Sequence, residues 1–598
     1  MKLSTNDKIK LLRELMIKNK VTAYLVTSSD FHQSEYIGDF FKTREYISNF
    51  SGSSGTALIT LNDAYLWTDG RYFLQAEKEL SESEFQLFKV GLKDTPTIQE
   101  FIKNTLNIND TLGFDGRTVS YNLMLDFIKA SKEKFFKLKI NLDLINKVWK
   151  DRPLLSKEKA FILEEKYSGE KANLKIKKLR YIMKTKKTTC HILSSLDDIC
   201  WLLNLRGKDI KYNPVVLSYA VIFLDKVLLF IDKSKLSKEI NLYLENINIE
   251  IHDYNNFYKY LCTLDKSLTI LLDYNKINSS IYEALPKEIK IINEPNPENN
   301  MKSIKNIVEI KNNYIAHLKD GIAMTKFIFW LKNNISKNKI SELDIVNKIE
   351  SLRKKQEGFI EPSFETIAAY GKNAAMMHYL PSNKHYSYLE PHNLILIDSG
   401  GQYLEGTTDI TRTISLGEVD PKIKKHYTYV LKSLIALSKS KFPHRTFGGN
   451  LDAIARNLIW EIGLDYRCAT GHGVGHFLNV HEGPNILRPS ASCIIHPDMV
   501  TTIEPGIYID NSHGIRLENE TLTTKSFKNE YGLFLEFKTL TFVPIDIDAI
   551  DPSFLNNDEI KWLNNYHKIV FEKISPFLNS EEIQWLKTQT KEIQKKTS

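Results

Sequence analysis

Residues 394–401 read LILIDSGG, and residues 407–413 read TTDITRT. The first segment predicts a buried strand that ends at Asp398, because four apolar residues precede the carboxylate and two glycines follow as a turn. The second segment alternates β-branched residues, which predicts a returning strand that carries Asp409. We therefore expect the carboxylates of Asp398 and Asp409 to point towards the same place.

Three later segments offer further ligands. Glycines flank His472, which allows the backbone to come close to whatever the imidazole binds. Pro505 favours an extended backbone at Glu504, and the Pro-Gly pair would end that strand just after the carboxylate. Glu518 follows Arg516 by two residues on a predicted strand, so the two side chains share a face and the guanidinium could orient the carboxylate.

These candidates form a set of four carboxylates and one imidazole. Carboxylates that converge within about 5 Å repel by roughly 3 kcal/mol per pair at an effective dielectric near 20. Two divalent cations would cancel this charge, and the ligand types favour Mn²⁺, or Zn²⁺, Co²⁺ or iron by availability. Two metals roughly 3.5 to 4 Å apart can share one hydroxide as a nucleophile. The candidate metal ligands are Asp398, Asp409, His472, Glu504 and Glu518.

In order and flanking sequence, these five residues resemble the dinuclear ligand set of the pita-bread metallopeptidases, family M24B, which includes methionine aminopeptidase, prolidase and aminopeptidase P. Four further phrases narrow the resemblance to the three-domain, cytosolic type of Xaa-Pro aminopeptidase. They are WTDGRYF at 67–73, NLRG at 204–207, NVHEGP at 479–484 and WLNNYH at 562–567. The resemblance therefore spans nearly the whole chain.

The resemblance implies an enzyme that cleaves the bond between any first residue and a penultimate proline. It implies that Asp398 chelates one metal and that Asp409 and Glu518 bridge both. His472 and Glu504 would complete the second site, and Glu504 would accept a proton from the attacking water. A hydroxide between the two metals, most readily Mn²⁺, would attack the carbonyl of the first residue.

The resemblance also assigns His378 and His481 to catalysis and substrate binding, as hydrogen-bonding partners of the substrate carbonyl or the oxyanion. Relatives usually carry another histidine four residues before the metal-binding one, where this chain has Cys468. A thiol is a weaker donor, so the role of that histidine is in doubt here, although we expect catalysis to survive. His476 and Arg71 are expected to be structural.

Three other readings remain open. A prolidase would share all five ligands but cut only dipeptides, and the long region ahead of the catalytic domain argues against it. Methionine aminopeptidase would not need some 300 residues before its catalytic domain. A non-catalytic binding protein on the same scaffold would lose metal ligands, whereas this chain keeps all five. The sequence contains no P-loop, no HExxH helix and no GxSxG elbow.

The 598 residues predict several domains. We expect two related α/β domains with a creatinase-like fold at 1–151 and 152–298, followed by an α+β pita-bread catalytic domain at 299–598. The two α/β domains share a plan of helix, strand and hairpin. The repeated segments are Leu12–Met16, Ala23–Thr27 and the hairpin 56–68 in the first copy, and Leu179–Met183, Cys190–Ser194 and the hairpin 219–231 in the second.

Apolar spacing predicts helices in the third domain. The first is expected to bury Ile304, Ile307, Val308, Ile315, Leu318 and Ile322, and another to bury Tyr427, Val430, Leu431 and Leu434. Asn450 is expected to cap a third, whose core face would be Leu451, Ile454, Ala455, Leu458 and Ile459.

Composition is that of a globular protein, with 42% hydrophobic and 26% charged residues. The net charge of +8 comes from scattered lysines without a basic, aromatic stripe, which argues against nucleic acid as a partner. Five cysteines without metal-finger spacing favour a reducing compartment. No apolar stretch is long enough for a membrane span. We expect a cytoplasmic protein that acts on peptides, and the resemblance suggests a homodimer.

Overall fold

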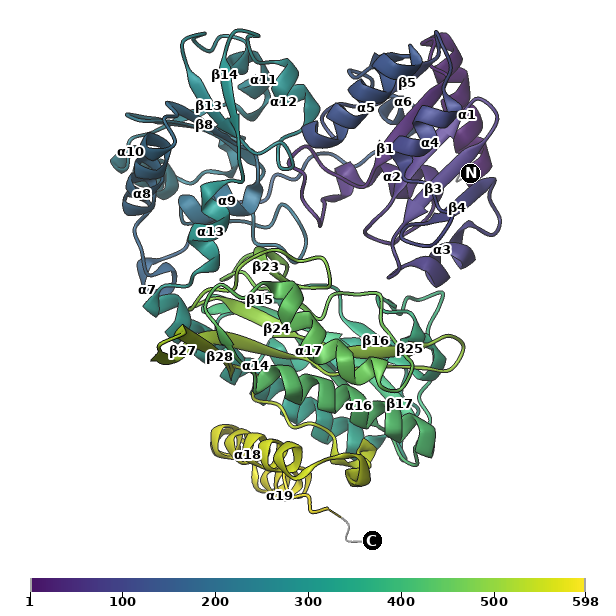
Figure 1. Cartoon of the computed structure of the whole chain (residues 1–598), viewed down its shortest axis with the longest axis vertical. Coiled ribbons are helices and arrows are strands. Elements are labelled where there is room, and N and C mark those ends of the chain that lie inside the picture. The colour runs from purple at the N-terminus through teal and green to yellow at the C-terminus, as the bar shows by residue number, and fades with distance from the viewer. Residues whose placement is uncertain (1–2, 596–598) are drawn as a thin grey trace. The chain divides into compact units, whose positions relative to one another are not determined.

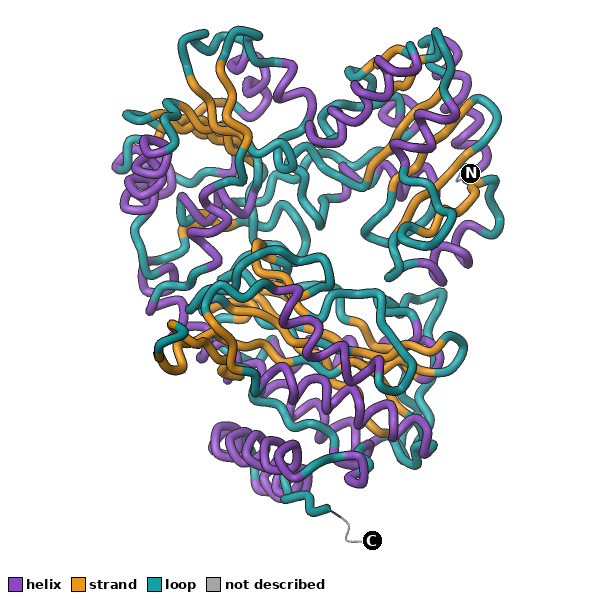
Figure 2. The backbone as a smooth tube through the Cα atoms, in the orientation of Figure 1, coloured by secondary structure: helices purple, strands orange, loops and turns teal. Residues whose placement is uncertain are grey.

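The computed structural model describes residues 3–595, which form two compact units (Figures 1 and 2). Unit 1 contains residues up to 163 together with 170–299, and unit 2 contains residues 164–169 together with those from 300 onward. Helix α13 (Pro297–Ser303) includes the change from unit 1 to unit 2. The domain limits expected at 151/152 and 298/299 stay predictions.

The first half of unit 1 is built on a six-stranded sheet of order β4-β3-β2-β1-β5-β6. Helix α1 begins where Ser4 and Asp7 form a capping box, and it buries Leu12 and Met16 as predicted. The strands are β1 (Ala23–Thr27), β2 (Thr56–Thr60), β3 (Ala64–Thr68), β4 (Phe85–Lys89), β5 (Thr111–Gly113) and β6 (Lys137–Lys139). The helices are α1 (Thr5–Lys18), α2 (Thr43–Ser48), α3 (Phe73–Leu80), α4 (Ile98–Thr105), α5 (Tyr121–Lys134) and α6 (Ile145–Val148).

The second half of unit 1 repeats this topology in the order β12-β11-β10-β8-β13-β14. In both sheets the first strand runs antiparallel to the hairpin and parallel to the fifth strand of the plan. The predicted duplication is therefore confirmed. Its elements are α8 (Ala172–Thr185), β8 (Cys190–Leu193), α9 (Leu196–Leu202), β10 (Ser218–Phe223), β11 (Val227–Ile231), α10 (Lys238–Asn246), β12 (Ile249–His252), α11 (Phe257–Leu261), β13 (Thr269–Leu272), α12 (Ser279–Glu283) and β14 (Lys290–Asn293), with β7 (Phe161–Ile162) paired to β9 (Leu205–Arg206).

Unit 2 combines several small sheets with long helices. Strand β17 lies between β16 and β20, and a six-stranded sheet runs β21-β28-β27-β24-β22-β23. The strands are β15 (Phe359–Pro362), β16 (Ile367–Tyr370), β17 (Leu394–Ser399), β18 (Gly401–Tyr403), β19 (Gly406–Thr407), β20 (Ile410–Ser415), β21 (Lys441–Pro443), β22 (Gly471–Gly473), β23 (Glu482–Leu487), β24 (Val500–Ile503), β25 (Gly506–Ile509), β26 (His513–Arg516), β27 (Asn519–Asn529) and β28 (Gly532–Thr539).

Helices cover the sheets of unit 2, and α16 packs against α17 and α18 (Figure 1). The predicted core face of α16, with Tyr427, Val430, Leu431 and Leu434, is fully buried. The helices are α7 (Glu165–Ser168), α14 (Ile307–Asn334), α15 (Glu342–Arg353), α16 (Pro421–Ser438), α17 (Gly448–Trp460), α18 (Asn557–Ile574) and α19 (Ser580–Gln589). None of the helices between residues 3 and 595 is long and apolar enough to cross a membrane.

The predicted core face of the first helix of this unit was wrong in its first half, whereas Ile322 is buried as expected. Helix α14 begins after Ile304, and Ile304, Ile307 and Ile315 are 42%, 65% and 44% exposed. The first half of α14 instead buries a polar face that includes His317 and Asp320. Burial is tolerated because these groups find partners, as where Asp320 accepts a hydrogen bond from Arg353 at 2.7 Å.

The prediction for α17 was wrong in two details. Asn450 is not the N-cap, because the helix begins at Gly448, and the Asn450 side chain accepts the Phe447 N–H at 3.2 Å instead. Ile454 is 38% exposed, whereas Leu451 and Ile459 are buried as expected.

Candidate metal centre

Two antiparallel strands deliver the first pair of carboxylates. Asp398 lies in β17, opposite Thr411 of β20. The return was predicted as one strand through Asp409, but Asp409 precedes β20, because the chain leaves the strand ladder at residues 408–409. Burial, and after it the carboxylate of Asp398, raises the pKa of Asp409, so the two buried carboxylates lie close enough to interact, as expected from the pairing of β17 with β20.

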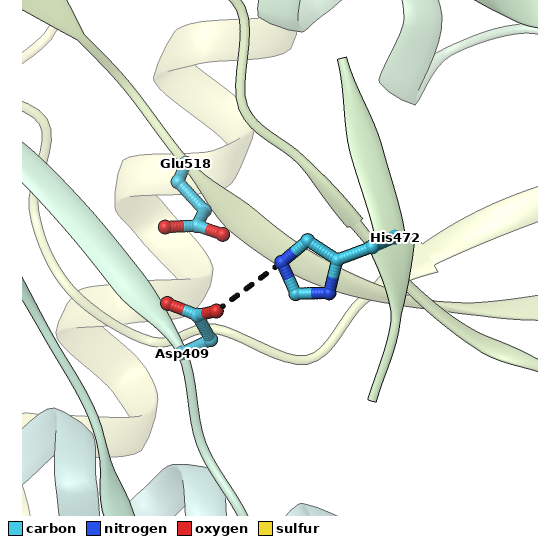
Figure 3. A group of neighbouring side chains, drawn as sticks. All are labelled: Asp409, His472 and Glu518. Atoms are coloured by element: carbon cyan, nitrogen blue, oxygen red, sulfur yellow. Dashed lines mark ion pairs between the residues drawn. The ribbon is translucent and has the colours of Figure 1, made fainter. Parts of the chain in front are cut away.

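Asp409, His472 and Glu518 bring their ligand atoms within 4.8 Å of one another. Figure 3 shows these three side chains pointing towards a common space from separate parts of the backbone. His472 Nε2 lies 3.4 Å from Asp409 Oδ2. Residues more than 100 positions apart in the sequence thus form one ligand group.

The orientation of His472 suits a metal ligand. Its Nδ1 lies 2.9 Å from the Gly473 carbonyl oxygen, and a carbonyl only accepts, so Nδ1 carries the proton. Nε2 faces the carboxylates, 3.4 Å from Glu504 Oε1 as well as from Asp409 Oδ2, and is the ring nitrogen left for a metal. A hydrogen bond that fixes the second ring nitrogen is the usual support for a metal-bound histidine.

Glu504 follows the last residue of β24, as the sequence predicted. Its Oε1 accepts a hydrogen bond from the Thr502 hydroxyl at 3.4 Å, and its Oε2 lies 3.9 Å from Arg516 Nε. Glu504 thus faces His472 on one side and a guanidinium on the other.

The predicted contact between Arg516 and Glu518 is not found in the structure. Its Nη2 hydrogen-bonds to Asp398 Oδ2, and its Nε donates to the Thr411 hydroxyl at 3.1 Å. Thr411 in turn donates to Glu518 Oε2 at 2.8 Å. Glu518 lies outside β26, so the strand-face argument that joined it to Arg516 does not hold; the hydroxyl of Thr411 bridges the two instead.

The electrostatics of the group fit divalent cations. Burial raises the pKa of Asp409 well above its usual range, and the carboxylates of Asp398 and Glu504 raise it further. Burial and the neighbouring Asp409 carboxylate raise the pKa of Glu518 in the same way. Within residues 3–595, Asp398 Oδ1 and Glu518 Oε1 are buried oxygens without a hydrogen-bond partner. Repelling carboxylates with unsatisfied oxygens are the arrangement that a divalent metal would satisfy.

The two further histidines are related to the ligand group in different ways. The His481 ring packs edge-on against the His472 ring, with centroids 4.2 Å apart and planes at 84°. His378 follows Met377, whose carbonyl accepts a hydrogen bond from Arg516 Nη1 at 3.4 Å. His476 is 2% exposed and its Nε2 lies 2.9 Å from the Tyr167 carbonyl oxygen, which agrees with a structural role.

Several residues around the group escaped the sequence analysis. The Tyr508 hydroxyl accepts a hydrogen bond from Arg516 Nη1 at 2.7 Å, and Glu520 Oε1 accepts the Asp409 N–H at 2.5 Å. Cys468 was already singled out from the sequence, and in the structure burial and the Glu504 carboxylate raise the pKa of its thiol to about 11. Glu520 could have been considered from the sequence, because it is a further carboxylate only two residues after Glu518.

Comparison with known proteins places these features in a family. Residues 314–525 match metallopeptidase family M24, and 533–593 match the C-terminal region of that peptidase. Residues 8–144 and 151–309 each match a creatinase/prolidase N-terminal domain. These matches confirm the predicted fold class of two related α/β domains followed by a catalytic domain.

Two Xaa-Pro aminopeptidases match nearly the whole chain, and a prolidase matches part of it. Xaa-Pro aminopeptidase 1 of Dictyostelium discoideum is 39% identical over 96% of this chain and 94% of that protein. The crystal structure of X-prolyl aminopeptidase from Caenorhabditis elegans, described as a cytosolic enzyme with a di-nuclear active site, is 33% identical with a TM-score of 0.95 over 99% of this chain and 100% of that one. The prolidase of Pyrococcus horikoshii is 27% identical with a TM-score of 0.50, over 62% of this chain and 99% of its own.

Proposed function

This chain belongs to the Xaa-Pro aminopeptidases of metallopeptidase family M24, and from that premise we propose that it removes the first residue of peptides whose second residue is proline. The observation that carries the proposal is the group of Asp409, His472 and Glu518, whose ligand atoms lie within 4.8 Å. A buried cluster of this kind has no stabilising role as it stands, because its carboxylates repel one another.

Asp398, Asp409, His472, Glu504 and Glu518 would hold two divalent cations, most readily Mn²⁺. When bound, the cations supply Lewis acidity, which polarises the substrate carbonyl and activates water. Glu504 accepts the proton of the attacking water, since it is the most accessible of the four carboxylates, with 17% of its side chain exposed. Arg516 donates a hydrogen bond to Asp398 and so orients its carboxylate.

His378 and His481 act on the substrate in this proposal. Both are half-buried, and His481 is held against the ring of His472. An X-Pro bond is a tertiary amide without an N–H, so the enzyme recognises the proline ring by shape and must protonate the leaving nitrogen. In this proposal the two histidines donate hydrogen bonds to the carbonyl oxygen and move that proton.

A prolidase is the second candidate, because it would share the ligand group. The match in length argues against it, since the prolidase from Pyrococcus horikoshii covers 62% of this chain whereas the X-prolyl aminopeptidase covers 99%.

The test is hydrolysis of Arg-Pro-Pro and Arg-Pro by chelator-stripped protein, with and without Mn²⁺, beside Glu504→Ala. We expect metal-dependent release of arginine from the tripeptide, with a loss of at least about 1,000-fold in the variant, because the proton acceptor and a metal ligand are both removed. Cleavage of the dipeptide alone would establish a prolidase. Cleavage of neither peptide by Mn²⁺-loaded protein would favour the non-catalytic scaffold.

A cytoplasmic location and a homodimeric state complete the proposal. The location is supported by the relative described as cytosolic and by five cysteines that are free of disulfides. Sedimentation equilibrium tests the second point, and a mass near 69.2 kDa at micromolar concentration would contradict the dimer.

A further inference from the structure

A buried ion pair beside the ligand group has no part in the mechanism above. It consists of Glu520, which is fully buried, and His317, which is 3% exposed. We propose that Glu520, held by His317, is a positioning residue that fixes the backbone of Asp409 and thereby sets its spacing from Glu518. This inference rests on the proposed metal site and adds two residues to it.

The contact that carries the inference is a side-chain to backbone hydrogen bond. Asp409 lies at residues 408–409, where the chain leaves the strand ladder, so its N–H has no place in the β17–β20 pairing. Glu520 Oε1 accepts this N–H at 2.5 Å. A charged acceptor makes a short, strong hydrogen bond, so the position of the Asp409 backbone depends on Glu520.

Strand β27 makes Glu520 a rigid support. Glu520 lies opposite Thr502 of β24 in the antiparallel pairing of β24 with β27. The Glu520 N–H donates a hydrogen bond to the Thr541 hydroxyl at 2.9 Å. Glu518 stands two residues earlier, so one short segment holds the Glu518 carboxylate and, through Glu520, the Asp409 backbone. The distance between the two proposed bridging carboxylates is therefore fixed by a single piece of chain.

His317 offsets the charge that Glu520 brings. Its Nδ1 donates to the Asn313 carbonyl at 2.7 Å, and its Nε2 lies 3.2 Å from Glu520 Oε2. Without this partner a fifth carboxylate would add its repulsion to the four at the site, and a buried charge that lacks a partner is strongly unfavourable. Helix α14 thus supports the site through the polar face that the sequence analysis did not predict.

The experiment is a calorimetric titration of chelator-stripped, full-length protein with Mn²⁺. Glu520→Met removes the acceptor at similar volume, and Glu520→Asp draws the carboxylate back by one methylene. We expect both to weaken Mn²⁺ affinity by roughly 10- to 100-fold, as is typical of outer partners of metal ligands. Glu520→Gln keeps an acceptor oxygen in place and is expected to stay within about threefold of wild type.

A matched control separates positioning from loss of stability. Glu559 is also buried in unit 2 and pairs with Lys432 at 3.0 Å, so Glu559→Met removes a comparable ion pair elsewhere and should leave Mn²⁺ affinity unchanged. If Glu520→Met does not fold, the Asp and Gln variants decide the question.

The inference is overturned if the folded Met and Asp variants bind Mn²⁺ within about threefold of wild type. It is also overturned if Glu520→Gln loses as much affinity as the other variants, because charge rather than the hydrogen bond would then be responsible. Wild-type protein that takes up no Mn²⁺ would instead overturn the proposed function, and this inference with it.

Discussion

The surroundings of two carboxylates in unit 2 make their ionised form unfavourable when no metal is bound. Asp409 and Glu518 are buried, and each lies beside other carboxylates, so the pKa of each is raised well above its usual range. In metal-free protein at neutral pH, ionising these groups costs stability. A raised carboxyl pKa means that the metal-free fold becomes more stable as the pH falls and the groups take up protons.

Asp409→Asn should therefore have opposite effects with and without metal. The variant keeps the shape of the side chain but removes one repelling charge, so the chelator-stripped variant should unfold at a higher temperature than stripped wild type. Activity should fall by more than about 100-fold and Mn²⁺ should no longer raise the unfolding temperature, because a ligand is lost. Thermal unfolding with and without Mn²⁺ checks both effects, and lower stability of the stripped variant would contradict the electrostatic argument.

Cys468 is a second residue whose ionisation can be predicted. With a pKa of about 11 its thiol is neutral at pH 7 and adds no charge beside Glu504. Catalysis depends on the ligand group rather than on this thiol, so Cys468→His should change the turnover of Arg-Pro-Pro by less than about tenfold. An increase of several orders of magnitude would show that the natural residue cripples the enzyme.

At the scale of elements, the hairpin of β25 and β26 connects Glu504 to Arg516 and packs against α16. His426 Nδ1 of α16 and His513 Nε2 of β26 are joined by a hydrogen bond of 2.9 Å, and both residues are buried. Burial lowers the pKa of His426, and burial together with His426 lowers that of His513 to about 4. The hairpin is therefore held by a pair of neutral histidines.

This pair predicts a loss of stability in acid. Between pH 6.5 and about 4 the unfolded chain binds a proton at His513 and the folded chain does not. The free energy of unfolding therefore falls as the pH drops through this range, and the full contribution of neutral His513 to stability is present above pH 6.5. His513→Gln should reduce the difference between denaturant midpoints at pH 7 and 4.5. His385→Gln, which changes an exposed histidine of the same unit, should leave it unchanged. Equal behaviour of the two variants would contradict the prediction.

In the whole molecule, the proposed metal ligands are confined to one of the two units. Unit 1 consists of the duplicated sheets, and every proposed metal ligand lies in unit 2. Unit 2 also includes residues 164–169, where the Asn306 and Asn312 side chains each donate to a backbone carbonyl at 2.9 Å. The amides on α14 thus hold a segment that the sequence would assign to the second domain.

Metal removal should act on one unit only. A ligand present at 100 times its dissociation constant stabilises the fold that binds it by about 2.7 kcal/mol. We expect calorimetry to show that chelation lowers the unfolding temperature of unit 2 while the transition of unit 1 stays where it is. Equal shifts in both transitions, or no shift on adding back Mn²⁺, would contradict this assignment.

Much of the fold could be predicted because its strands and helices follow local patterns of apolar and turn residues in the sequence. The strands at 23–27, 56–60 and 64–68 have the limits that alternation and turn residues predicted. The duplication was visible because each copy repeats the same helix, strand and hairpin. The first half of the helix at 307–334 was predicted with the wrong core face, because it buries polar residues such as Asp320, whose partner Arg353 is distant in the sequence.

Several helices and strands, the family and the candidate ligands could be recognised in the sequence, because periodicity and short motifs are properties of neighbouring residues. Which charges meet depends on the tertiary structure. Arg516 pairs with Asp398 rather than with Glu518, and Glu520 reaches the Asp409 backbone 111 positions away. Electrostatic and hydrogen-bonding partners are chosen by distance in space, which depends on how the strands and helices pack.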